Sequence, residues 1–163
     1  MKKQRLFFIL SAVCFLVMIA LTLVLATDMR IQLDNLSDSP SDTTEEGLAN
    51  FGIALGLSII MVLLYVYAIV LAGPFLLKGF AAIFMKKALV FLGIFFDAVI
   101  LIFHAVLCVS SIVDNGFSTD MLWLVAFVAL PAAALTLDIL GVRCNAAADA
   151  EPIEEAETET ETV

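Results

Sequence analysis

Residues 88–113 read ALVFLGIFFDAVILIFHAVLCVSSIV, an almost wholly apolar run that contains one acidic residue, Asp97, and the only histidine of the chain, His104. A run of about 18 or more apolar residues with few charges is typical of a transmembrane helix. At about 1.5 Å per residue, this stretch is long enough to cross a hydrocarbon core of about 30 Å. Residues 88–113 therefore predict a helix that spans a membrane.

Three further apolar runs, at about residues 6–26, 51–71 and 121–142, have the same character. They agree with the composition of the chain, which is 63% hydrophobic and has a mean hydropathy of +1.09. Soluble domains contain about 45–50% apolar residues on average. We therefore predict an all-α integral membrane protein in which residues 1–145 form a bundle of four transmembrane helices.

The first apolar run also has features of a secretory signal peptide, because a basic segment precedes it and the small residue Ala26 ends it. The apolar core of a signal peptide is about 7–15 residues long. The run 6–26 is longer, so an uncleaved first span is the favoured interpretation. In the alternative, cleavage after Ala26 would leave three spans and an external N-terminus.

The basic residues predict the orientation of the chain, because cytoplasmic segments beside membrane spans are rich in Lys and Arg. The segments before the first span, between the second and third, and after the fourth contain Lys2, Lys3, Arg5, Lys78, Lys86, Lys87 and Arg143. The segment 27–50 contains a single basic residue, Arg30. We therefore expect both termini in the cytoplasm, residues 27–50 as an outer loop, and a location in the plasma (cytoplasmic) membrane.

The formal net charge of −9 arises largely from the outer loop and from the tail, residues 146–163. A tail of repeated Glu and Thr cannot bury enough apolar surface to fold, so we predict that it is disordered. Acidic residues contribute little to orientation, so the tail leaves the predicted placement of the termini unchanged. We expect the lipid bilayer as the surroundings of the chain and no nucleic-acid partner.

The segment between the second and third spans is too apolar for a free loop and too charged for a span. Gly73 and Pro74 are predicted to end the second helix, because proline removes a helical hydrogen bond. Residues 73–87 are then expected to lie in the membrane interface as a connector. Its lysines would contact anionic lipid headgroups while its Phe and Leu side chains stay in the acyl boundary; these lysines are Lys78, Lys86 and Lys87.

The residue patterns that carry most catalytic chemistry are absent from the sequence. A haem held by two histidines would need a second histidine beside His104, and the sequence has none. Di-iron bundles need Glu-x-x-His motifs, which the sequence also lacks. The P-loop, Gly-x-Ser-x-Gly and His-Glu-x-x-His patterns are missing, as is a Cys-x-x-Cys pair. We therefore expect no metal, no cofactor and no enzymatic activity.

A polar stripe on the third span is the strongest pattern inside the predicted membrane region. Its members recur at helical spacing and are Gly93, Asp97, His104, Cys108 and Ser111. Asp97 follows Lys87 by ten residues, which places it up to about 15 Å into the membrane and near the midplane. An ionised Asp there costs about 3 kcal/mol or more, so we expect Asp97 to be protonated, hydrogen-bonded or in a wet cavity.

Two interpretations of Asp97 follow, and they belong to different function classes. In the first, Asp97 binds a proton or cation, His104 is a second station and Tyr67 lies nearby. In the second, Asp97 hydrogen-bonds a neighbouring helix, for which Pro131 would free a backbone carbonyl as an acceptor. Asp138 lies close to Arg143 in sequence and is expected to reach the cytoplasmic interface at small cost.

Small residues suggest where helices pack closely, in the way that small-xxx-small motifs do. These residues are Gly52, Gly56, Gly93, Ala126, Ala129 and Ala133. They predict a compact bundle, a homo-oligomer or a membrane protein partner. The favoured interpretation of the whole chain is a non-catalytic accessory or interaction subunit of a membrane complex. The alternative is an oligomeric proton- or cation-coupled transporter or channel that uses Asp97 and His104.

Overall fold

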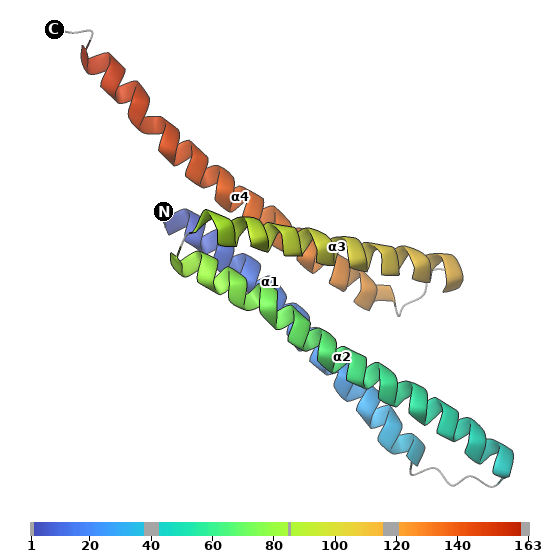
Figure 1. Ribbon diagram of the computed structural model, residues 1–163. Helices are drawn as coiled ribbons and strands as arrows, with labels where there is room; N and C mark the ends of the chain where they lie inside the picture. The colour runs from blue at the N-terminus through green and yellow to red at the C-terminus, as the bar shows by residue number, and fades with distance from the viewer. Residues whose placement is uncertain (1, 38–42, 85, 116–120, 161–163) are drawn as a thin grey trace. The chain divides into compact units, whose positions relative to one another are not determined.

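The computed structural model describes residues 2–37, 43–84, 86–115 and 121–160, which are helical almost throughout (Figure 1). The helices are α1 (Lys2–Ser37), α2 (Thr44–Phe84), α3 (Lys87–Asn115) and α4 (Met121–Thr160). Each holds a stretch long and apolar enough to cross a membrane, namely Lys3–Ser37, Thr44–Phe84, Lys87–Val113 and Leu122–Cys144. The prediction of an all-helical chain with four candidate membrane spans is confirmed.

Helix α4 extends beyond the fourth predicted span and ends at Thr160. Residues 38–42 of the predicted outer loop, the side chains from residue 145 onward and residues 161–163 lie outside the described part. The disorder of the tail therefore stays a prediction, as does the cytoplasmic placement of both termini.

Helix α2 begins with a capped first turn. The Oγ1 atom of Thr43 accepts a hydrogen bond from the backbone N–H of Glu46 at 3.2 Å, which satisfies a donor that has no partner within the helix. Glu45 and Glu46 occupy the first turn, where negative charge is favoured by the helix dipole. The second helix therefore starts well before the apolar run that predicted it.

Pro74 lies inside α2 rather than at its end. The helix continues to Phe84, so the predicted helix end at Gly73 and Pro74 is wrong, while the interfacial position of residues 73–87 stays a prediction. Proline cannot donate a hydrogen bond to the carbonyl of Val70, yet helices in membranes tolerate proline where neighbouring groups satisfy the backbone. Lys78, one turn beyond Pro74, is buried, so tertiary packing holds the helix together past the proline.

The chain divides into two compact units. One consists of Met1–Phe15 with Pro74–Val163, and the other of Leu16–Gly73. In the first unit, α3 packs along α4 (Figure 1). The buried residues on these helices recur at alternating intervals of three and four, the pattern of helices that pack side by side in bundles: Val90, Gly93, Asp97, Ile100 and His104 on α3, and Phe127, Pro131, Ala134, Asp138 and Gly141 on α4.

The apolar core of the first unit combines one large aromatic side chain with smaller aliphatic ones. Phe8 of α1, Ala81 and Ala82 of α2, and Val90 of α3 are buried together. Gly141 of α4 has the tightest surroundings of the described glycines, because an added Cβ atom there would lie 3.3 Å from the Cβ atom of Phe7 and 3.4 Å from the ring of Phe8. A glycine is needed there because α1 passes so close to α4.

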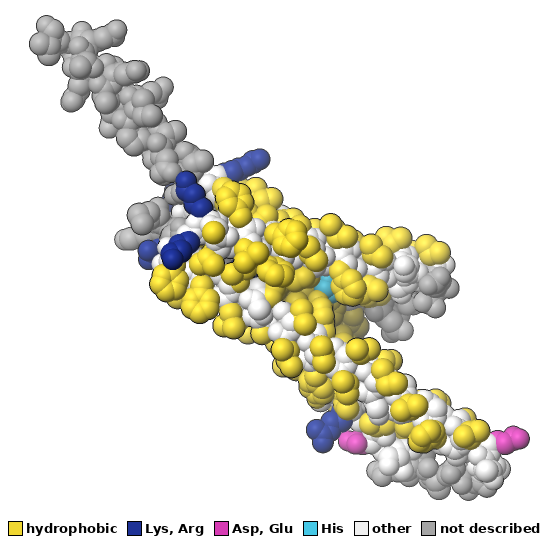
Figure 2. Space-filling model, viewed as in Figure 1, with side chains coloured by type: hydrophobic (Ala, Val, Ile, Leu, Met, Phe, Trp, Pro, Cys, Tyr) yellow, Lys and Arg dark blue, Asp and Glu magenta, His cyan; other side chains and the backbone are white. Residues whose placement is uncertain are grey.

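In the unit Leu16–Gly73, the α1 segment buries Met18, Thr22 and Ala26, and the α2 segment buries Ala68 and Leu71. Thr22 donates its hydroxyl hydrogen bond to the carbonyl of Met18 at 2.8 Å, so its polar group is satisfied within the helix. Most other apolar side chains of this unit are exposed. Hydrophobic side chains also cover most of the described face of the molecule in Figure 2, as expected of helices whose solvent is lipid.

The small residues predicted to mediate helix packing have different surroundings. An added Cβ atom at Gly52 or Gly56 would meet no described atom within 4 Å, so neither glycine forms a helix contact within the described chain. Ala129 and Ala133 are exposed, because the buried stripe of α4 lies on the neighbouring face. Ala129 and Ala133 therefore do not pack inside the described bundle, and contact of Ala129, Ala133, Gly52 and Gly56 with another molecule stays a prediction.

Candidate functional site

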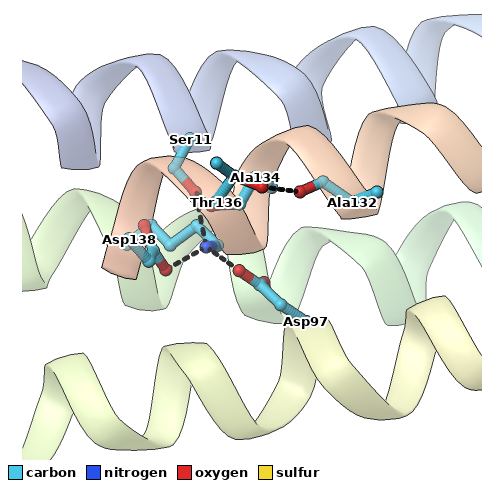
Figure 3. A network of polar contacts seen from close by, with 7 residues as sticks. Ser11, Asp97, Ala132, Ala134, Thr136 and Asp138 are labelled. Carbon is cyan, nitrogen blue, oxygen red and sulfur yellow. Dashed lines mark hydrogen bonds and ion pairs between the residues drawn. The ribbon is translucent and has the colours of Figure 1, made fainter. Parts of the chain in front are cut away.

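A buried ion-pair cluster in the first unit is the most polar feature of the described bundle. The Nζ atom of Lys78 lies 2.7 Å from Oδ2 of Asp97 and 2.5 Å from Oδ2 of Asp138. It also donates a hydrogen bond to the Oγ atom of Ser11 at 2.6 Å. Figure 3 shows the three side chains of α1, α3 and α4 pointing toward this nitrogen. We call Lys78, Asp97, Asp138 and Ser11 the Lys78 site.

The Lys78 site is closed to its surroundings. Lys78 and Asp138 are each 1% exposed, and Asp97 and Ser11 are fully buried. A lysine ammonium has three N–H donors, and the three partners use all of them. The site therefore joins all four helices through one nitrogen atom.

The buried stripes of the helices explain how these side chains meet. Asp97 and Asp138 occupy stripe positions on α3 and α4, where their side chains turn toward the interior. Gly93, one turn before Asp97, leaves space there: an added Cβ atom would lie 3.7 Å from Oδ2 of Asp138 and 4.0 Å from Cγ of Lys78. A larger side chain at Gly93 would therefore crowd the lysine stem and the carboxylate.

Ser11 and Phe15 of α1 complete the surroundings of the ammonium group. The Ser11 hydroxyl accepts its hydrogen bond from Lys78 and donates one to the backbone carbonyl of Ala134 at 3.1 Å (Figure 3). The Phe15 ring is fully buried, and its centroid lies 5.1 Å from Nζ of Lys78. A cation at this distance from an aromatic face is stabilised by the electrons of the ring.

Asp97 is thus bonded to a lysine of α2. Pro131 was expected to free the backbone carbonyl of Phe127 as a hydrogen-bond acceptor for Asp97. Among the described residues, Asp97 bonds to Lys78 instead. The expectation that Asp138 reaches the cytoplasmic interface is wrong, because its carboxylate is buried against Lys78. The expectation that Lys78 contacts lipid headgroups is wrong for the same reason. Lys86 and Lys87, by contrast, are exposed, and their contact with anionic lipid stays a prediction.

His104 lies two turns beyond Asp97 on the same buried stripe of α3. Its ring stacks on that of Phe127 with a centroid separation of 5.6 Å and an interplanar angle of 7°. Its Nδ1 atom lies 2.8 Å from the carbonyl oxygen of Ile100, as expected for a ring N–H that donates within its own helix. Tyr67, which one interpretation of the sequence placed near Asp97, belongs to the unit Leu16–Gly73, and its place near Asp97 stays a prediction.

Two members of the site were not predicted from the sequence. Ser11 lies in an uninterrupted apolar run, and Lys78 was assigned to the lipid interface. A usable signal was present, because Ser11 lies three residues after Phe8 and four before Phe15, and Lys78 lies four after Pro74, all at stripe spacing.

Within the part of the chain that the structure describes, no three His, Cys, Asp or Glu side chains gather into a group that could hold a metal ion. Compared with known proteins, the chain matches no family model, no curated protein and no solved structure.

Proposed function

We propose that this protein is a non-catalytic, multi-pass membrane protein that serves as an accessory or interaction subunit of a membrane complex. In this proposal the Lys78 site determines how the four helices pack. The observation that supports it is the complete use of the Lys78 ammonium group by partners from α1, α3 and α4. In this proposal the charged groups of the site bond to one another and stabilise the bundle, and none of them is left to bind a substrate.

The burial of the site favours this role over chemistry on a substrate. A group that acts on a substrate must contact it, and the side chains of Lys78, Asp97 and Asp138 are at most 2% exposed. Breaking a buried ion pair by removing one partner costs about 3–5 kcal/mol, because the remaining charge is left uncompensated. Any packing of the helices that separates Lys78 from its carboxylates is disfavoured by an amount of that order.

An oligomeric proton- or cation-coupled transporter or channel is the second candidate. The observation that favours it is the presence of two acidic side chains around one basic side chain at a buried position. Ionisable residues within membrane spans often mark ion or proton pathways. In this candidate, Asp97 and His104 would lie on one path along α3.

In this proposal the protein lies in the plasma membrane, and both of its termini are in the cytoplasm. We expect reporters fused to either terminus to be active on the cytoplasmic side. Cysteines introduced in place of Ser37 and Ser118 should react with membrane-impermeant thiol reagents added from outside. An N-terminus that is accessible from outside would contradict this orientation and would favour cleavage after Ala26.

Reconstitution separates the two candidate functions. Purified protein in proteoliposomes should produce no proton flux above that of empty vesicles under an imposed pH gradient. In the native membrane, the protein and its Asp97→Asn variant should migrate in the same complex, larger than the protein alone. Asn is the suitable probe because it retains the shape and hydrogen-bonding capacity of Asp but does not titrate. Protein-dependent flux that the Asn variant loses would overturn the accessory role in favour of the transporter.

A further inference from the structure

The charges and hydrogen bonds of the Lys78 site do not balance if both carboxylates are ionised. One ammonium group then faces two carboxylates, which leaves a net charge of −1 inside the bundle. The second oxygen of each carboxylate, Oδ1 of Asp97 and Oδ1 of Asp138, is buried and accepts no hydrogen bond from the described residues. Burial of an uncompensated charge costs several kcal/mol, and unpaired buried acceptors add to that cost.

We propose that the Lys78 site is a proton-binding site, in which Asp97 and Asp138 together hold one proton in the folded protein. One carboxylate takes a proton from water and becomes a neutral carboxylic acid, and the other keeps its charge. The site then contains one positive and one negative charge. Two carboxylates bonded to the same nitrogen lie within about 4–6 Å of each other, a distance at which each disfavours ionisation of the other.

The groups around the carboxylates come from all four helices. From α1 they are Ser11, Phe15 and the Cys14 thiol, which lies within electrostatic reach of the three charges. From α2 the group is Lys78, and α3 and α4 supply the carboxylates themselves. Among the described side chains that face the site, Lys78 is the only cation. A single positive charge is therefore available to two acids.

A proton fits this site better than a metal ion does. A metal cation such as Ca²⁺ needs about six to eight oxygen ligands, whereas a proton needs one. Lys78 already occupies the position between the two Oδ2 atoms, and only two carboxylate oxygens remain without partners among the described residues. One of these two oxygens is available to carry the proton.

Infrared spectroscopy of the protein in lipid vesicles tests the proposal directly, because a protonated carboxylic acid has a C=O stretch that an ionised carboxylate lacks. At neutral pH the wild type should show one such band. The band should be absent from the Asp97→Asn/Asp138→Asn double variant and from each single variant, because the one remaining carboxylate then balances the charge of Lys78 without a proton. The exposed Asp28 supplies a matched control, since Asp28→Asn should leave the band unchanged. No band in the wild type, or a band that survives the double substitution, would overturn the proposal.

The dependence of stability on pH gives a second measurement. An Asp side chain in the unfolded chain releases its proton above about pH 4. The folded state therefore holds one proton more than the unfolded state, so stability decreases as pH rises. For the wild type, the equilibrium constant for folding should fall with rising pH more steeply than it does for the single Asn variants. The difference should be about tenfold per pH unit, as long as the proton stays bound.

The control variant Asp28→Asn should keep the wild-type slope. Equal slopes for the wild type and for both single Asn variants would contradict a bound proton, as would a band or a slope that depends on sodium or potassium rather than on pH. These measurements are independent of the proposed accessory role, because they require neither a partner nor flux. A protein without flux that shows the band would keep both proposals.

Discussion

Replacement of Lys78 by Met should cost about 3–5 kcal/mol of stability, the largest effect that we expect from a single substitution. Met is similar in size and apolar, so the change removes the charge and the three hydrogen bonds of the ammonium while it fills most of the space. The carboxylates of Asp97 and Asp138 would then be buried without a cation. Thermal unfolding in detergent, with the yield of monodisperse protein, measures the loss.

Lys86→Met is the matched control, because Lys86 is exposed and its charge is solvated. It should leave the unfolding midpoint nearly unchanged. Adding Asp97→Asn and Asp138→Asn to Lys78→Met removes the remaining negative charge of the site. The triple variant should therefore recover a large part of the lost stability, since replacing a buried ionic cluster as a whole is often tolerated. A Lys78→Met protein as stable as the wild type would show that the lysine does not hold the bundle.

Replacement of Gly141 by Leu should also destabilise the first unit, by about 1–3 kcal/mol. The first carbon of the new side chain would already lie 3.3 Å from Cβ of Phe7, an atom close to the backbone that cannot turn away. The bundle can accommodate Leu only if α1 and α4 separate. The unfolding midpoint in detergent is the measurement, and Gly141→Ala should show a smaller decrease.

Gly79→Leu supplies the control for crowding, because an added Cβ atom at Gly79 would meet no described atom within 4 Å. Gly79 is in the same unit and also within a helix, so both substitutions change the intrinsic helix propensity alike. Equal stability of the Gly141 and Gly79 variants would show that the close contact of α1 with α4 does not form in the folded protein.

The polar site was only partly predictable from sequence. Asp97 could be predicted as part of a polar site because it is an acidic residue in the middle of a long apolar run. Lys78 and Asp138 were misplaced because each lies near other charged residues in the sequence, which suggested a position at the membrane interface. Lys78 was also misplaced because proline locally favours a helix end, so α2 was expected to stop at Pro74. In the structure α2 continues to Phe84, and Lys78 lies on its buried side.

The sequence by itself determined that the chain forms four long apolar helices, because length and apolar composition are properties of each segment alone. It also placed Gly93, Asp97 and His104 on one face of α3, since the helical repeat relates residues within a helix. Only the tertiary structure decided which faces meet. The bond between Lys78, Asp97 and Asp138 joins residues on three helices, and its formation depends on the rotation and depth of each helix. Those quantities result from the packing of all the stripes together, with close contacts such as that at Gly141, and no single segment encodes them.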